Sequence, residues 1–299
     1  MSADATQKRT VIELIETGAA RLTEAGVAFG HGTANAFDEA ARLVLWQLKL
    51  PIEAIDEVAD QAVSPADGAR VDALIAERIA SRKPAAYLTK EAWLQGVPLY
   101  VDERAIVPRS FIAELLVDGS IDYWLGEHTQ RVLGLCTGNG SLAVLAAMTY
   151  PDITIDAADL STTALEVAAI NVTRHELDAR ITLLASDGLE DVHGPYDLIL
   201  CNPPYVNAES MSALPAEYRA EPELALAGGS DGMDVIRTLL RDAPAAMSER
   251  GVLVLEIGNE RDYFEAAFPM LEVVWLETSA GEDQVLLVTR EALAGLESD

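Results

Sequence analysis

The second half of the chain alternates short apolar runs with helical segments, and this pattern limits the possible folds most strongly. Apolar runs of strand length occur at 132–136, 153–158, 181–185, 197–201, 251–257, 273–276 and 285–288. Helical spacing fills most of the intervals, at 141–148, 162–177, 235–247 and 262–268. Such alternation predicts an α/β fold with a mostly parallel, doubly wound sheet that is covered on both faces. No helix separates the last two runs, so we expect an antiparallel hairpin to close the sheet.

The first 90 residues have a helical pattern instead. Apolar side chains recur at helical spacing in 11–22, 40–50 and 64–81, and Ser64 and Pro65 are typical of a helix start. Pro84 ends this pattern. Residues 91–108 favour two short strands with turns, and 110–125 favour a connecting helix. We therefore predict a small helical domain at 1–90, a β-hairpin and connecting helix at 91–125, and an α/β domain at 126–299.

The distribution of charge narrows the class of partner. The chain has a formal net charge of -28, and residues 101–299 hold 35 acidic and 11 basic side chains. A nucleic-acid surface needs basic groups that neutralise phosphates, so we expect no direct nucleic-acid binding. Long-range steering would instead favour a basic partner. Acidity that serves only solubility is the alternative, and the sequence leaves it open.

Composition also bears on the compartment. Met1–Thr10 is polar and carries both charge signs, unlike the apolar core of a signal peptide. No uncharged apolar stretch reaches the length of about 18 residues that a membrane span needs. The two cysteines, Cys136 and Cys201, fit neither a zinc site nor a disulfide framework, and we expect a buried thiol pair. We predict a cytoplasmic protein with no metal site and no membrane association.

A glycine-rich turn follows the first predicted strand of the α/β domain. Gly138 and Gly140 allow a sharp turn, and the helix behind them offers free N–H groups to an anionic part of a ligand. Asp159 ends the next strand, at a spacing that suits a carboxylate accepting hydrogen bonds from two ribose hydroxyls. With Ala143 the turn also reads G-x-G-x-x-A, so a dinucleotide and another nucleoside cofactor both remain open at this point.

The sequence Asn202-Pro203-Pro204-Tyr205 directly follows the fourth predicted strand. The first and fourth strands are neighbours in a doubly wound sheet, so this loop should face the glycine turn. Asn202 and the Pro203 carbonyl can accept both N–H bonds of an amide or amino group and hold it in line with a methyl donor. Tyr205 would offer a flat wall. The motif therefore indicates methyl transfer to a planar nitrogen, and a merely rigid Pro-Pro turn is the structural alternative.

Several separated segments identify a family. They are Gly-His-Gly-Thr at 30–33, Ala-Tyr-Leu-Thr at 86–89, Tyr-Val-Asp-Glu-Arg at 100–104, Val-Pro-Arg-Ser at 107–110, Asn-Pro-Pro-Tyr-Val at 202–206, Glu-Pro-Glu-Leu at 221–224 and Glu-Ile-Gly-Asn at 256–259. Along nearly its whole length the chain resembles the N(5)-glutamine methyltransferases of the PrmB type, which act on large-subunit ribosomal protein L-three. Their sister group, the HemK type, acts on release factors.

The resemblance implies a class I S-adenosylmethionine methyltransferase, Rossmann-like, with a helical domain and hairpin that help to hold a basic protein substrate. The implied cofactor contacts are Thr137, Gly138, Asn139, Gly140, Asp159, Leu160, Asp187, Gly188 and Asn202. The implied catalytic residues are Asn202, Pro203 and Tyr205, and Pro204 and Arg109 join them as candidate substrate contacts. A plain salt bridge is an equal alternative for Arg109. The family usually has an acidic residue where this chain has Gly134, so we expect weakened cofactor binding.

Other functions stay open at this stage. An N(6)-adenine methyltransferase shares the Asn202 motif, but it should present a basic face. A release factor could replace the ribosomal protein as the substrate. Gly134 favours a catalytically silent ribosome-assembly factor, whereas the intact Asn202 motif disfavours it. A dinucleotide oxidoreductase is opposed by the same motif.

Overall fold

The computed structural model describes residues 8–296. Residues 1–7, most of the polar stretch on which we based the absence of a signal peptide, lie outside this description. The described chain forms two compact units. The first runs to Glu91 and includes Pro215–Ala220, and the second comprises Ala92–Leu214 and the chain from Glu221 onward. The segment 215–220 therefore belongs to the helical unit although it lies far along the sequence.

The first unit is helical, as its apolar spacing predicts. Its helices are α1 (Val11–Glu24), α2 (Ala36–Leu48), α3 (Ile55–Val58), α4 (Pro65–Ser81) and α5 (Ala85–Thr89), with a 3-10 turn η1 (Ile52–Ala54). Thr10 and Glu13 form a capping box at the start of α1, and Ser64 caps α4. Apolar faces of α1, α2 and α4 form the core, in which Ile15 and Leu43 are completely buried.

A short hairpin opens the second unit. Strands β1 (Ala92–Leu94) and β2 (Val97–Leu99) pair in antiparallel fashion, and Gln95 and Gly96 both have positive φ in the turn between them. Our prediction of one helix over 110–125 was wrong. Helix α6 (Ile112–Val117) is followed by Gly119 at φ +75° and a 3-10 turn η2 (Asp122–Trp124). The left-handed glycine ends the helix because α-helical backbone requires negative φ.

The main sheet has seven strands in the order β5-β4-β3-β6-β7-β9-β8. The strands are β3 (Arg131–Leu135), β4 (Thr154–Asp159), β5 (Ile181–Ala185), β6 (Tyr196–Cys201), β7 (Met247–Glu256), β8 (Val274–Thr278) and β9 (Gly281–Thr289). The first five positions pair in parallel, and β9 runs antiparallel to both β7 and β8. The predicted parallel sheet with an antiparallel hairpin at its end is confirmed.

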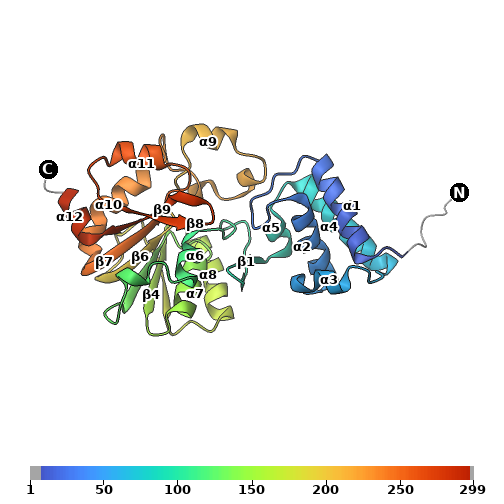
Figure 1. Cartoon of the computed structure of the whole chain (residues 1–299), viewed down its shortest axis with the longest axis horizontal. Coiled ribbons are helices and arrows are strands. Elements are labelled where there is room, and N and C mark those ends of the chain that lie inside the picture. The colour runs from blue at the N-terminus through green and yellow to red at the C-terminus, as the bar shows by residue number, and fades with distance from the viewer. Residues whose placement is uncertain (1–7, 297–299) are drawn as a thin grey trace. The chain divides into compact units, whose positions relative to one another are not determined.

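Helices cover both faces of this sheet (Figure 1). One face is covered by α6, α7 (Ser141–Thr149) and α8 (Thr162–Arg174), and the other by α10 (Asp234–Ala246), α11 (Arg261–Ala267) and α12 (Arg290–Leu296). Alternate strand residues feed the two cores, as Leu198 and Ile199 illustrate. Shorter elements are α9 (Ala208–Ala213), η3 (Tyr218–Ala220) and η4 (Glu223–Ala225). Within residues 8–296, no helix has both the length and the apolar character of a membrane span.

The strand order brings the two predicted functional loops together. Leu135 at the end of β3 pairs with Cys201 at the end of β6 in a parallel register. The glycine turn and the Asn202 loop begin directly after these two residues. Both loops therefore leave the sheet at the same edge, as the doubly wound order predicts.

Candidate active site

The glycine turn is a tightly wound strand-to-helix connection. Gly138 and Gly140 have φ of +56° and +79°, and Cys136 also has a positive φ of +52°. A Cβ atom on Gly140 would lie 3.1 Å from the Cβ of Ala168, so this position requires glycine for space as well as for backbone conformation. A left-handed non-glycine residue such as Cys136 is uncommon, and such conformations cluster at ligand sites.

Asp159 closes the turn from the end of β4. Its carboxylate accepts hydrogen bonds from the backbone N–H groups of Gly138 and Ser161, both at 2.8 Å. Burial nevertheless raises the pKa of Asp159 above its ordinary value, and the two N–H bonds offset this only in part. Further donors, such as the two hydroxyls of a ribose, would stabilise the charged carboxylate. The geometry therefore suits the predicted ribose contact.

Ser186, Asp187 and Gly188 form a second loop beside the turn. The Ser186 hydroxyl donates to the carbonyl of Gly188 at 2.9 Å and accepts from the N–H of Asp191 at 3.1 Å, which fixes the loop. Asp187 and Gly188 line the same cavity as Asp159, together with the apolar side chain of Leu160. A carboxylate beside apolar side chains matches the amino edge and the flat faces of an adenine.

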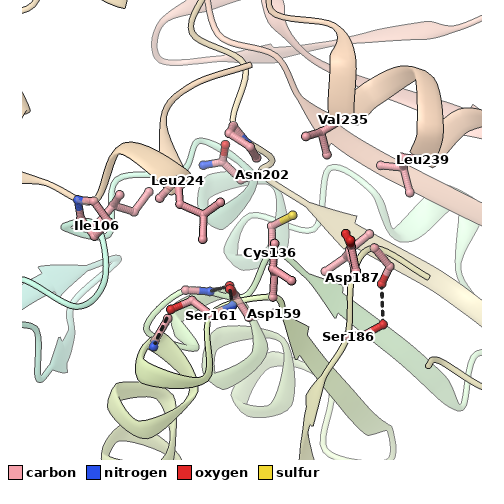
Figure 2. A pocket seen from close by; sticks show the side chains of 18 of the residues that line it. Ile106, Cys136, Asp159, Ser161, Ser186, Asp187, Asn202, Leu224, Val235 and Leu239 are labelled. Atoms are coloured by element: carbon pink, nitrogen blue, oxygen red, sulfur yellow. Dashed lines mark hydrogen bonds between the residues drawn. The ribbon is translucent and has the colours of Figure 1, made fainter. Parts of the chain in front are cut away.

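The Asn202 loop borders this cavity as well. Figure 2 shows Cys136 between Asn202 on one side and Asp159 on the other. Pro204 lines the cavity too, whereas neither Pro203 nor Tyr205 is found among its described lining residues. The predicted contact between Tyr205 and the substrate amide thus stays a prediction.

The half-buried Tyr205 instead faces the turn after β7. A Cβ atom on Gly258 would lie 2.5 Å from the Tyr205 ring, so the ring rests directly on this glycine. The phenol oxygen lies 3.4 Å from a carboxylate oxygen of Glu256. Burial and the nearby Glu256 charge raise the pKa of Tyr205, which keeps the phenol protonated. The Tyr205 ring therefore packs the Asn202 loop against the turn after β7.

The cavity has a volume of about 330 Å³ and mostly apolar walls. Of the predicted cofactor contacts, Gly138, Asp159, Leu160, Asp187, Gly188 and Asn202 line it. The other predicted cofactor contacts in the turn, Thr137, Asn139 and Gly140, are not among the described residues that line the cavity. They shape the turn instead. The Thr137 N–H donates to the carbonyl of Ala158, and the Asn139 carbonyl accepts from the side chain of Asn171. The donor set and the cavity's character fit S-adenosylmethionine. Among the described residues, no cluster of metal-binding side chains occurs.

Arg109 does not border the cavity in the described chain. Its guanidinium forms two hydrogen bonds to the carboxylate of Glu221, at 2.8 and 2.7 Å. The salt bridge that we weighed as the alternative is therefore present. A direct contact between Arg109 and a substrate stays a prediction.

Sequence reasoning missed several residues of the cavity wall. They come from the segment after the hairpin, from η4 and from α10, and they include Arg104. Figure 2 shows four others, Ile106, Leu224, Val235 and Leu239. Helical periodicity predicted α10 but could not tell which edge of the sheet it would overhang. The sequence predicts Cys136 only as half of a buried thiol pair. Cys201 is buried beside it as expected, but Cys136 is half-buried and lines the cavity.

Comparisons with known proteins support the methyltransferase fold. A family model described as "Methyltransferase small domain" matches residues 115–217. The fold resembles the catalytic domain of hMettl16, crystallised with a MAT2A 3'UTR hairpin, at a TM-score of 0.51 and 13% identity over 74% of this chain and 80% of that one. Because the identity is so low, this likeness supports the fold alone.

Curated relatives match far more closely. A ribosomal protein uL3 glutamine methyltransferase from Bordetella pertussis is 53% identical over 95% of this chain and 96% of its own length. A protein of the same name from Burkholderia pseudomallei is 50% identical over 96% of this chain and 97% of its own. Proteins of this family take their methyl group from S-adenosylmethionine, which the cavity fits. The chain belongs to the family of ribosomal protein uL3 glutamine methyltransferases.

Proposed function

We propose that this protein methylates the side-chain amide nitrogen of a glutamine in ribosomal protein uL3, the large-subunit protein L-three. The observation that carries the proposal is the meeting of the Asn202 loop and the Gly138 turn at one cavity. The relatives' names supply the substrate, since both are uL3 glutamine methyltransferases. S-adenosylmethionine supplies an electrophilic methyl group when it is bound.

The chemistry needs an exact orientation of the amide. An amide nitrogen is a weak nucleophile because its lone pair is delocalised into the carbonyl. In our proposal, the Asn202 side-chain oxygen accepts one N–H of the glutamine, and the backbone carbonyl of Pro203 accepts the other. Two acceptors align the nitrogen with the methyl group and raise its electron density. Pro203 and Pro204 keep the loop in one shape because their φ angles are fixed.

No dedicated base is needed. Methylation leaves a cationic amide nitrogen, which is strongly acidic and loses its proton readily. The apolar side chains of Leu160, Leu224 and Leu239 line the cavity, and we propose that they exclude water once the cofactor and the glutamine fill it. On this proposal Asp159 holds the ribose, and Asp187 with Gly188 contacts the adenine.

The partner and the compartment follow from the same proposal. Ribosomal proteins are basic, and residues 101–299 of this chain carry a strong excess of acidic side chains. Opposite net charges speed the encounter of the two proteins. We propose that methylation takes place in the cytoplasm, where ribosomal proteins are made.

The test is the rate of methyl transfer to purified, unmethylated uL3. Asn202→Ala should lower kcat about 10²- to 10³-fold, because one acceptor of the reacting amide is lost. Asn259→Ala is the matched control, since Asn259 is exposed and bonds only Gln284 among the contacts described for it. It should leave the rate unchanged.

Other outcomes identify the alternatives. An Asn202→Ala variant that keeps the wild-type rate contradicts the proposed mechanism. A wild-type protein that binds S-adenosylmethionine but leaves uL3 unmodified would point to a different substrate, such as a release factor. A protein that binds no cofactor would fit a silent assembly factor, and Gly134 would be the first residue to examine.

A further inference from the structure

Glu256 is a buried carboxylate outside the cavity. It ends β7, one residue after Leu255, which pairs with Cys201 at the end of β6, and it is 2% exposed. One of its oxygens accepts hydrogen bonds from the Ser110 hydroxyl at 2.6 Å and from the Phe111 N–H at 2.9 Å. The carboxylate thereby fixes the start of α6 against the end of β7.

The other oxygen of Glu256 faces the Asn202 loop. It lies 3.4 Å from the Tyr205 hydroxyl, and Gly258 in the same turn supports the Tyr205 ring. A single side chain thus connects the Asn-Pro-Pro-Tyr loop with the segment at 107–111.

A second buried carboxylate holds the other end of that segment. Glu221 is 5% exposed, accepts from the Val107 N–H at 2.9 Å and forms the two hydrogen bonds with Arg109. Ile106, directly before the segment, lines the cavity, and so does Pro222, directly after Glu221. The two carboxylates therefore fix a stretch of chain that continues into the cavity wall.

We propose that Glu256 is a positioning residue for methyl transfer, acting through Tyr205 and Ser110 to hold the Asn202 loop in its receptive orientation. The inference rests on the proposed function. Glu256 itself does not border the cavity in the described chain, so it acts on the orientation of the Asn202 loop and does not itself bond the substrate amide.

The charged form of Glu256 is the one that makes these contacts. A carboxylate accepts from the Ser110 and Phe111 donors and from Tyr205, whereas protonation removes acceptor capacity. Burial raises the pKa of Glu256 to about 6, although Ser110, the backbone N–H groups and Arg109 oppose the shift. The other ionisable groups that face this site are Tyr205 and, beyond Arg109, Glu221. On β9 its register partner is the apolar Val285.

Activity and stability should therefore respond to pH in opposite directions. The folded-state pKa of Glu256 is raised, so its contribution to stability is greatest when it is protonated and falls as the pH rises from about 4.5 to about 6. Activity requires the carboxylate and should fall as the pH drops below about 6. A decrease of kcat on acidification would thus not arise from unfolding caused by this group.

The experiment compares wild type with Glu256→Gln, at several pH values, by kcat and KM for uL3 and Kd for S-adenosylmethionine. Wild-type kcat should fall below about pH 6. Glu256→Gln should lower kcat about 10- to 100-fold at neutral pH and abolish the acid decrease, with an unchanged cofactor Kd. Gly258→Ala, which displaces the Tyr205 ring from Glu256, should lower kcat at neutral pH and weaken the acid decrease.

Glu114→Gln is the matched control. Glu114 also accepts from a serine hydroxyl and a backbone N–H, both of Ser279, but it lies in α6 near the surface and outside the catalytic loops. It should leave kcat and its pH profile unchanged. A Glu256→Gln variant with wild-type kcat and a wild-type acid decrease would overturn the proposal.

A direct readout of Tyr205 separates this proposal from the proposed function. In protein labelled with 3-fluorotyrosine, the resonance lost in Tyr205→Phe should shift with a midpoint near pH 6 in wild type and not in Glu256→Gln. If wild type leaves uL3 unmodified but this shift occurs, the proposed substrate is wrong and the contact between Glu256 and Tyr205 stands. A Tyr205 resonance that ignores pH would contradict the contact itself.

Discussion

Gly134 is a small residue at a place with room for a larger one. It lies in β3, and a Cβ atom there would be 3.6 Å from the Thr137 hydroxyl and 3.7 Å from Ala143, which are ordinary contact distances. The Thr137 hydroxyl and the side-chain nitrogen of Asn139 are buried without a hydrogen-bond partner in the described chain. The turn thus holds two buried polar groups without a partner beside the position where the resemblance implies an acid.

Gly134→Asp should therefore strengthen cofactor binding. The resemblance implies that an acid at this position contacts the methionine end of the cofactor. One hydrogen bond from the cofactor to a charged group contributes about 1.5–3 kcal/mol, so we expect roughly a tenfold or greater decrease in the Kd for S-adenosylmethionine. Isothermal titration calorimetry measures it. Gly134→Ala controls for filling the space without a charge. An unchanged Kd in Gly134→Asp, or an equal gain in both variants, would contradict this explanation.

At the scale of elements, the segment 215–220 connects the two units in an unusual way. The chain leaves the Asn202 loop through α9, contributes Pro215–Ala220 to the helical unit, and returns to line the cavity at Pro222. Glu217 is completely buried in the helical unit, with Arg82 at 2.7 Å and Arg78 at 3.5 Å. The Tyr218 ring lies 4.2 Å from the ring of His31.

Glu217→Ala should destabilise the helical unit. It removes a buried carboxylate from two arginines, but Arg78 keeps its 2.8 Å contact with Glu39. We expect a loss near the lower end for a broken buried ion pair, about 3 kcal/mol in the free energy of unfolding. Urea denaturation measures it. Glu209→Ala, at an exposed position in α9, should change stability by less than about 0.5 kcal/mol. Equal stabilities of the two variants would show that Glu217 contributes nothing.

Local sequence signals predicted most of these elements but not their long-range contacts. The strand from 181 to 185 and the helix from 65 to 81 were found because periodicity is a local property. The glycine turn, Asp159 and Asn202 were found because each lies at a strand end or directly after one. Leu224, Val235 and Arg104 reach the cavity only through tertiary packing, and no local pattern marks Glu217 as part of the helical unit.

At the scale of the whole molecule, charge is the dominant feature. Residues 101–299 carry 35 acidic and 11 basic side chains, and of the acidic ones in the described chain only Asp102, Glu217, Glu221, Glu256 and Glu260 are buried. Most of this charge therefore faces solvent, where it acts over roughly 10 Å at moderate salt. A basic substrate would be drawn to such a surface.

Salt should therefore slow capture of uL3 more than it slows the chemical step. We expect kcat/KM for uL3 to fall at least about tenfold when ionic strength rises from about 0.05 M to about 0.5 M, while kcat changes little. Initial rates at several salt concentrations measure both. Far-ultraviolet circular dichroism at each salt concentration controls for unfolding. A kcat/KM that is insensitive to salt would assign the acidic surface to solubility alone.

The most direct test of the central claim is the position of the transferred methyl group. Purified protein, S-adenosylmethionine and unmethylated uL3 are incubated together, and the uL3 peptides are mapped by tandem mass spectrometry. The account predicts one added methyl on the side-chain amide of a single glutamine, which is lost when Asn202→Ala replaces the wild type. A methyl group on any other kind of residue, or an equal yield with Asn202→Ala, would contradict it.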